Sequence, residues 1–138
     1  MHDSRVPAHP LEVILARNLI ANVSVPAFIA NVDGDIVFYN DAAGALIGKR
    51  FEESGRLTPE EWSKIGPLDA AGAPVADGRG PLTTALRERR PAHERFHICT
   101  DERKIVAVET SAVPLAGATG FHGAVVVFWP VAEGDEDA

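Results

Sequence analysis

The chain contains little cysteine: Cys99 is the only one among 138 residues. A single cysteine cannot form an internal disulfide bond, and unpaired thiols are typical of reducing compartments. The five histidines are scattered along the chain and, with one cysteine, give no spacing typical of a metal site. These absences exclude a small disulfide-stabilised domain. They predict a cytoplasmic protein without metal ligands.

The chain also lacks a basic surface, since its formal net charge is −7. The only clustered cations lie among acidic residues; they are Arg87, Arg89, Arg90 and Arg95. A net negative charge repels the phosphate backbone of nucleic acids. We therefore expect no nucleic-acid partner.

No hydrophobic run is long enough to cross a membrane. Residues 11–32 form the most apolar stretch, yet Glu12, Arg17 and Pro26 interrupt it. No charged start with an apolar core precedes a cleavage site, as a signal peptide would require. We expect neither membrane insertion nor export.

Motifs of catalysis are absent as well. The sequence shows no nucleophile motif, no ordered His, acid and Ser set, and no phosphate-binding glycine loop. The glycines near Gly72, Gly78 and Gly80 follow no predicted strand and indicate a loop. The sequence predicts no catalytic residue and no enzyme.

What the chain does contain is enough apolar material for one domain. Its length is typical of a single domain, and 46% of its residues are hydrophobic. We expect a flexible leader at 1–9, one domain at 10–131 and an acidic disordered tail at 132–138.

The most informative stretch is PAFIANVDGDIVFYNDAAGAL, from Pro26 to Leu46. Asp33 and Gly34 predict a two-residue hairpin turn between two apolar strands. Asn40 or Asp41 can accept hydrogen bonds from the first free amides of a helix that begins at Ala42. The stretch therefore predicts strand, turn, strand and capped helix.

A helix is expected in front of this hairpin, at 10–24. Its apolar residues share one broad arc that should dock on the sheet or on a partner's helix; they are Val13, Leu15, Ala16, Leu19, Ile20 and Val23. A helix this short is marginal alone in water, so this face must be covered.

The middle of the chain predicts short helices. Thr58 to Glu61 form a capping box with proline at the first helical position, and this helix ends at Gly66 and Pro67. A mobile loop is expected over Leu68–Gly80, and a helix over Leu82–Arg90.

The last third predicts three consecutive strands, at Ala92–Thr100, Lys104–Val113 and Phe121–Trp129. Both faces of the third strand are apolar. A strand of this kind is covered on both sides, so we expect it near the centre of the sheet.

This order of elements resembles the PAS sensor domain, from about Leu11 to Val131. The resemblance is carried by the opening hairpin and by LDAAGAP, GPLTTALRERRP, KIVAVETSAVPL and GFHGAVVVFWPV. It implies an α+β fold: a five-stranded antiparallel sheet with short helices on one face and the N-terminal helix on the other face or at a dimer interface.

The chain departs from the family where many members end in an Asp-x-Thr triad. That place reads Trp129, Pro130 and Val131, followed by AEGDEDA. We therefore expect the output to act on a separate protein or on self-association.

The cofactor motifs of the PAS family are not found at the matching positions of this sequence. Flavin-binding members carry a reactive cysteine in a helical motif, whereas Cys99 lies in a predicted strand. Haem-binding members use a histidine on the long helix, and Pro81–Arg90 contains none. His93 and His97 lie about 13 Å apart on a strand and cannot share a metal ion there, so both are expected on the solvent side. His93 stays open as a haem ligand, and the cofactor is unknown.

The resemblance places a ligand cavity between the sheet and the middle helices. Its candidate lining residues are Phe28, Tyr39, Leu46, Trp62, Ile65, Leu86, Phe96, Val108, Thr110, Val127 and Trp129. Tyr39, Thr110 and Trp129 could orient a polar group.

These observations predict a sensory PAS domain that binds a small organic ligand or cofactor, signals to a partner protein in trans, and forms a homodimer through the Leu11–Val23 helix. One alternative is a small cone-shaped α+β enzyme acting on a hydrophobic ligand, for which only Glu109 with Tyr39 could act as acid and base. Another is a ligand-free adaptor between proteins.

Overall fold

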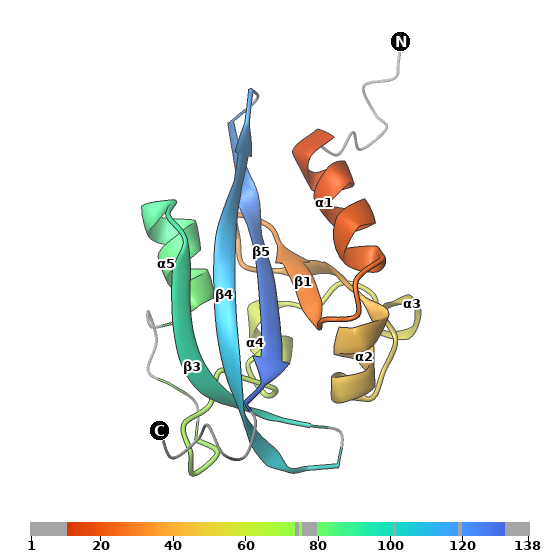
Figure 1. The fold of residues 1–138 in the computed structure, drawn as a ribbon, viewed down its shortest axis with the longest axis vertical. Coiled ribbons are helices and arrows are strands. Elements are labelled where there is room, and N and C mark those ends of the chain that lie inside the picture. The colour runs from red at the N-terminus through yellow and green to blue at the C-terminus, as the bar shows by residue number, and fades with distance from the viewer. Residues whose placement is uncertain (1–10, 74, 76–79, 101, 119, 132–138) are drawn as a thin grey trace.

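The structure is a computed structural model, described over residues 11–73, 75, 80–100, 102–118 and 120–131. One antiparallel sheet has the strand order β2-β1-β5-β4-β3 (Figure 1). Its strands are β1 (Ala27–Ala30), β2 (Ile36–Tyr39), β3 (Ala92–Cys99), β4 (Ile105–Gly117) and β5 (Gly120–Pro130). The helices are α1 (Leu11–Ala21), α2 (Asp41–Ile47), α3 (Phe51–Ser54), α4 (Pro59–Trp62) and α5 (Pro81–Glu88). The predicted α+β architecture is confirmed.

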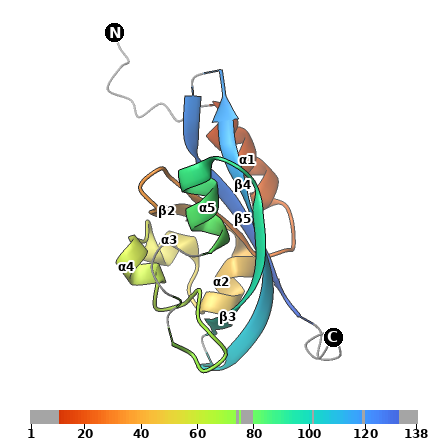
Figure 2. The same cartoon turned by 90° about the vertical axis from the view of Figure 1, so that its left-hand side faces the viewer.

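The sheet separates the helices into two groups. On the face called inner here, α5 packs on β3, β4 and β5, with α2 to α4 beside it. On the opposite, outer face, α1 packs against the other end of the sheet (Figures 1 and 2). β5 lies between β1 and β4, so the central position predicted from its two apolar faces is confirmed.

The opening hairpin differs from the predicted two-residue turn. The connection spans Asn31 to Asp35, and only Gly34 has a positive φ, of 87°. The side-chain oxygen of Asn31 accepts hydrogen bonds from the amides of Asp33 and Asp35, at 2.9 and 3.0 Å. This side chain closes the turn before the strands pair, so the two-residue prediction is wrong.

Asn40 follows β2 and caps α2. It is one of the two predicted caps, and the helix begins at Asp41, one residue before the predicted Ala42. The side-chain oxygen of Asn40 accepts from the amides of Ala43 and Ala27, at 3.0 and 3.1 Å. Its side-chain nitrogen donates to the carbonyls of Ile20 and Val25, both at 2.8 Å. The residue is 3% exposed. One buried side chain therefore joins the end of α1, the start of β1 and the start of α2.

The docking face of α1 is narrower than predicted. Ile20 is buried and Ala16 packs beside it, next to Ile29 and Phe38 of the sheet. Leu15 and Leu19, expected on the docking face, are 58% and 67% exposed.

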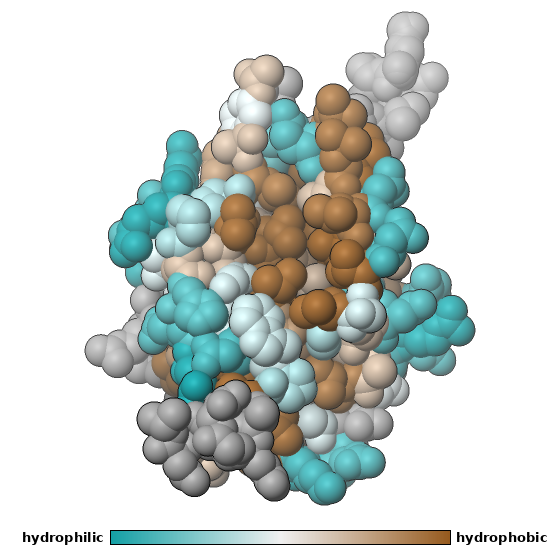
Figure 3. Space-filling model, in the orientation of Figure 1, coloured by the Kyte–Doolittle hydropathy of each residue, from teal (hydrophilic) through white to brown (hydrophobic). Residues whose placement is uncertain are grey.

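Arg17, expected outside the apolar arc, lies over the Phe38 ring at 4.4 Å. With Ile20 and Arg17 against the sheet, the side of the helix that carries Leu15 and Leu19 lies away from it. Figure 3 shows the result as an apolar surface over α1 that continues onto the middle of the sheet.

The middle segment is short helices and turns. Thr58 and Glu61 form the predicted capping box of α4, and the Gly66–Pro67 peptide bond is cis. Leu68 pairs with His97 of β3, and Asp69 closes a turn with Ala73.

Several predictions fall outside the described residues. Residues 74 and 76–79 of the predicted mobile loop are among them, as are the predicted leader at 1–9 and tail at 132–138. Within the part of the chain that the structure describes, no helix is long and apolar enough to cross a membrane.

Candidate functional site

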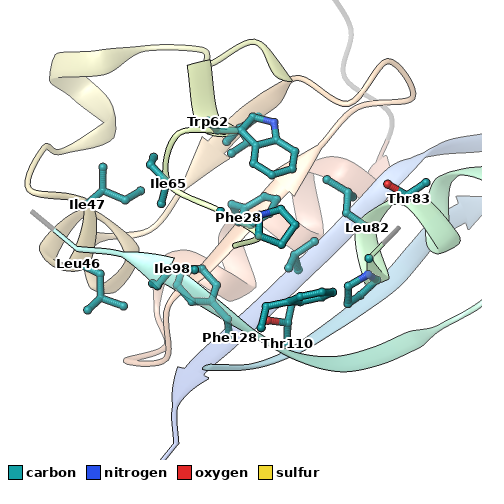
Figure 4. A pocket seen from close by; sticks show the side chains of 17 residues that line it. Phe28, Leu46, Ile47, Trp62, Ile65, Leu82, Thr83, Ile98, Thr110 and Phe128 are labelled. Atoms are coloured by element: carbon teal, nitrogen blue, oxygen red, sulfur yellow. The ribbon is translucent and has the colours of Figure 1, made fainter. Parts of the chain in front are cut away.

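A cavity of about 100 Å³ lies between the inner face of the sheet and the short helices (Figure 4). The sheet supplies one wall, and α2, α4, α5 and the turn at Gly66 and Pro67 supply the others. The described lining residues are Phe28, Ile36, Leu46, Ile47, Trp62, Ile65, Gly66, Pro67, Gly80, Pro81, Leu82, Thr83, Phe96, Ile98, Thr110, Val126 and Phe128.

Trp62 is held at the cavity by its own helix and by the hairpin. The capping box begins α4 at Pro59, just after Leu57 pairs with Ile36 at the end of the β1–β2 connection. The indole nitrogen donates to the carbonyl of Gly34 at 3.0 Å. The ring lies 6.1 Å from the ring of Phe28, tilted by 44°. The indole N–H is the only side-chain donor of Trp62, and the hydrogen bond to Gly34 already uses it. The ring therefore presents only apolar surface to a ligand.

The polar side chains among the described lining residues are those of Thr83, on α5, and Thr110, on β4. None of these residues is charged. Apolar walls with few polar groups are typical of small-molecule sites, so the cavity is suited to a neutral organic ligand.

The structure brings six of the predicted lining residues together: Phe28, Leu46, Trp62, Ile65, Phe96 and Thr110. Leu86 and Val108 lie on the same side of the sheet, where they pack into the core without lining the cavity.

Tyr39 also lies on the inner side, but its hydroxyl points elsewhere. It donates to the carbonyl of Lys49 at 2.7 Å and contacts the Ser54 hydroxyl at 2.9 Å. Burial raises the pKa of Tyr39 above its usual value. The hydroxyl therefore serves the α2–α3 connection and does not orient a group in the cavity.

Trp129 and Val127 were predicted on the wrong face. Along β5, Val126 and Phe128 line the cavity, so the residues between and after them point to the outer face. Trp129 is 39% exposed there, near His93. Because both faces of β5 are apolar, its sequence alone did not show which set points inward. For the same reason, Val126 and Phe128 were not predicted as lining residues.

A polar cluster occupies the outer face of β3 and β4. The His93 ring contacts the Ser111 hydroxyl at 2.6 Å and one Glu109 oxygen at 2.7 Å. Arg95 donates to the other Glu109 oxygen, at 2.8 and 3.0 Å. The hydrogen bonds from Arg95, and then His93, lower the pKa of Glu109.

The enzyme alternative requires Glu109 and Tyr39 to act as an acid–base pair, and the position of Glu109 in this cluster separates the two residues. Glu109 lies on the outer face, whereas Tyr39 packs into the core on the inner face. Glu109 lies between the inward residues Val108 and Thr110 and so points outward, because successive residues of a strand face opposite sides. The prediction that Glu109 and Tyr39 could act together is therefore wrong.

The cavity does not fit a haem or a flavin. Its volume is below the roughly 300–1,000 Å³ of pockets that hold drug-sized ligands. Its described lining includes no histidine and no cysteine; His93 lies in the outer-face cluster, and Cys99 contacts the Thr100 carbonyl. Among the described residues, no three His, Cys, Asp or Glu side chains gather as metal ligands.

Comparison with known proteins places the fold. The family model described as PAS fold matches residues 20–136. Among solved structures, the PAS domain of Bordetella pertussis BvgS has a TM-score of 0.63 and 15% identity, covering 91% of this chain and 90% of that one. A PAS domain from Colwellia psychrerythraea gives 0.62 and 15%, with coverages of 88% and 98%.

The LOV protein of Rhodobacter sphaeroides gives a TM-score of 0.69 at 12% identity, with coverages of 90% and 70%. These likenesses concern the fold alone. No curated protein matches the sequence. Because the family model covers most of the chain, and the fold is similar to solved PAS domains, this chain belongs to the PAS fold family.

Proposed function

We propose that this PAS sensory and signalling domain binds a small organic molecule in the inner cavity and passes the change to a second copy of the chain or to a separate partner protein. The observation that carries the proposal is the apolar cavity, whose walls come from the sheet and from three short helices. A ligand there contacts the sheet and three short helices at once. Its binding can therefore favour one arrangement of the helices over another.

The proposed route of output is a homodimer formed through α1. Leu11, Leu15 and Leu19 recur every four residues, lie on one side of the helix and are more than half exposed. Ile14 of α1 and Val113 of β4 are also exposed. Figure 3 shows an apolar patch over α1 and the middle of the sheet. Exposed apolar patches of this kind mark interaction sites.

The same proposal includes a non-catalytic, cytoplasmic protein. The one acid–base pair considered for catalysis is divided between the two faces of the sheet. A ligand-free adaptor would share the dimer surface but leave the cavity without a role. The two functions therefore differ in whether a molecule is retained.

Native mass spectrometry of the freshly expressed full chain tests both parts. We expect a dimer, and an additional mass that is lost when the protein is partly unfolded and refolded. A dimer that never carries a ligand, even after incubation with a metabolite extract, would favour the adaptor. A monomer at every concentration would contradict the proposed output.

A further inference from the structure

We propose that the cavity selects uncharged molecules of about one aromatic ring that carry a single hydrogen-bonding group. This inference rests on the proposed sensory function and specifies its ligand. The cavity volume of about 100 Å³ sets the size. This volume is below the roughly 150 Å³ of an apolar cavity that accommodates benzene. One ring is therefore the upper limit of size, and it enters with a small outward movement of the walls.

The charge of the ligand follows from the walls. No described lining residue carries a charge, and Arg95 and Glu109 already pair with each other on the outer face. An ionised ligand would lose its hydration without gaining an opposite charge, at a cost of several kcal/mol. Neutral molecules avoid this cost.

The shape follows from the aromatic residues. Phe28 lies between Trp62 and Phe128, with ring centroids 6.1 and 6.2 Å away and tilts of 44° and 58°. Phe96 lines the same space. Tilted rings at these separations expose their faces and edges to the cavity. A planar aromatic ring packs favourably against both.

The single polar group follows from the two threonines. Neither the Thr83 nor the Thr110 hydroxyl makes a hydrogen bond to another described residue. Each hydroxyl can donate one hydrogen bond and accept others. They are therefore the groups that would distinguish a phenol from a hydrocarbon of the same size.

The two tryptophans give a direct test, because Trp62 lines the cavity and Trp129 lies on the outer face. The Trp129→Phe variant reports the cavity by fluorescence, and the Trp62→Phe variant reports the outer face. We expect phenol and toluene to change the fluorescence of Trp62 and to leave that of Trp129 unchanged. Benzoate should bind at least tenfold more weakly than phenol.

The hydroxyls are tested in the Trp129→Phe background. Thr110→Val or Thr83→Val should weaken phenol binding about 3- to 10-fold, the effect of one lost hydrogen bond, and leave toluene binding unchanged. Thr84→Val is the matched control, because Thr84 lies on the same helix and does not line the cavity. Unchanged phenol affinity in both cavity variants overturns the role of the hydroxyls.

The two proposals fail in different ways. Benzoate binding at Trp62 as tightly as phenol overturns the neutral ligand class and leaves a sensory cavity. Silence of Trp62 toward all three probes also overturns the ligand class. Retention of a different molecule in native mass spectrometry would then preserve the sensory function, and its absence would overturn both.

Discussion

Glu109 illustrates how neighbouring side chains decide the chemistry of a residue. Arg95 and His93 contact both of its oxygens, and these contacts lower its pKa. A carboxylate that works as a general base or acid near neutral pH needs the opposite shift. The residue therefore holds β3 and β4 together across the outer face.

The Glu109 pKa predicts a pH-dependent stability. Because the folded-state value is below the ordinary 4.5, the stabilisation is fully present above that pH and is lost as the pH falls through the folded-state value. We expect Glu109→Gln to unfold at lower urea concentration than the native chain at pH 7. The two proteins should converge in strong acid.

Glu102→Gln is the control for this experiment. Glu102 is exposed, and its described ion pair, with Lys104 at 3.6 Å, is exposed as well. Exposed pairs of this kind contribute little to stability. An equal pH-dependent loss in both variants would contradict the assignment to Glu109.

Also at the scale of residues, six of the lining residues could be predicted from the sequence. The residues of β5 that point into the cavity could not. Phe28 and Trp62 were identified from aromatic character in the right elements. Val126 and Phe128 were missed because a shift of one residue along β5 exchanges one apolar set for another. Only the packing of α5 and α1 on opposite faces distinguishes them.

At the scale of elements, local signals predicted the ends of helices better than their packing. Thr58 was predicted as a cap, and Asn40 as one of two candidates with Asp41, because each can satisfy free amides within its own turn. The length of the hairpin connection depended on Asn31. Its side-chain oxygen takes hydrogen bonds from the amides of Asp33 and Asp35, in place of hydrogen bonds between the two strands. The orientation of α1 involves contacts between residues distant in sequence, such as Ile20 with Ile29 and Arg17 with Phe38.

Asn40 gives the prediction that belongs to this scale. Asn40→Ala removes hydrogen bonds to three elements and leaves buried amides and carbonyls without partners. We expect a loss of about 2–4 kcal/mol in the free energy of unfolding, measured with urea. Asn22→Ala, which removes one exposed hydrogen bond to Asn18, should change it by less than about 0.5 kcal/mol. Similar losses in both variants would contradict the joining role of Asn40.

For the whole molecule, the fold places the cavity and the apolar α1 surface on opposite faces of one sheet. The family resemblance predicted this arrangement, because the order of strands and helices extends over almost the whole chain. The identity of a ligand could not be predicted, since cavity size depends on how elements far apart in sequence close on each other.

The arrangement predicts that oligomeric state depends on the exposed leucines of α1. Leu15→Glu combined with Leu19→Glu should weaken self-association at least tenfold, because the interface would then bury two like charges. Light scattering over a range of concentrations measures this. Val32→Glu, an exposed residue in the β1–β2 connection, should leave association unchanged. An equal effect of Val32→Glu would place the interface elsewhere.

Asn40 also connects the two faces around the edge of the sheet rather than through it. Its amide binds carbonyls at and just after the end of α1, while the helix that it caps carries Leu46 and Ile47 of the cavity wall. Binding equilibria that share such a connection are reciprocal. Whatever factor a ligand imposes on self-association, self-association imposes on the affinity for that ligand. The ligand dissociation constant would then depend on protein concentration, and the domain would report how abundant it is as well as what it binds.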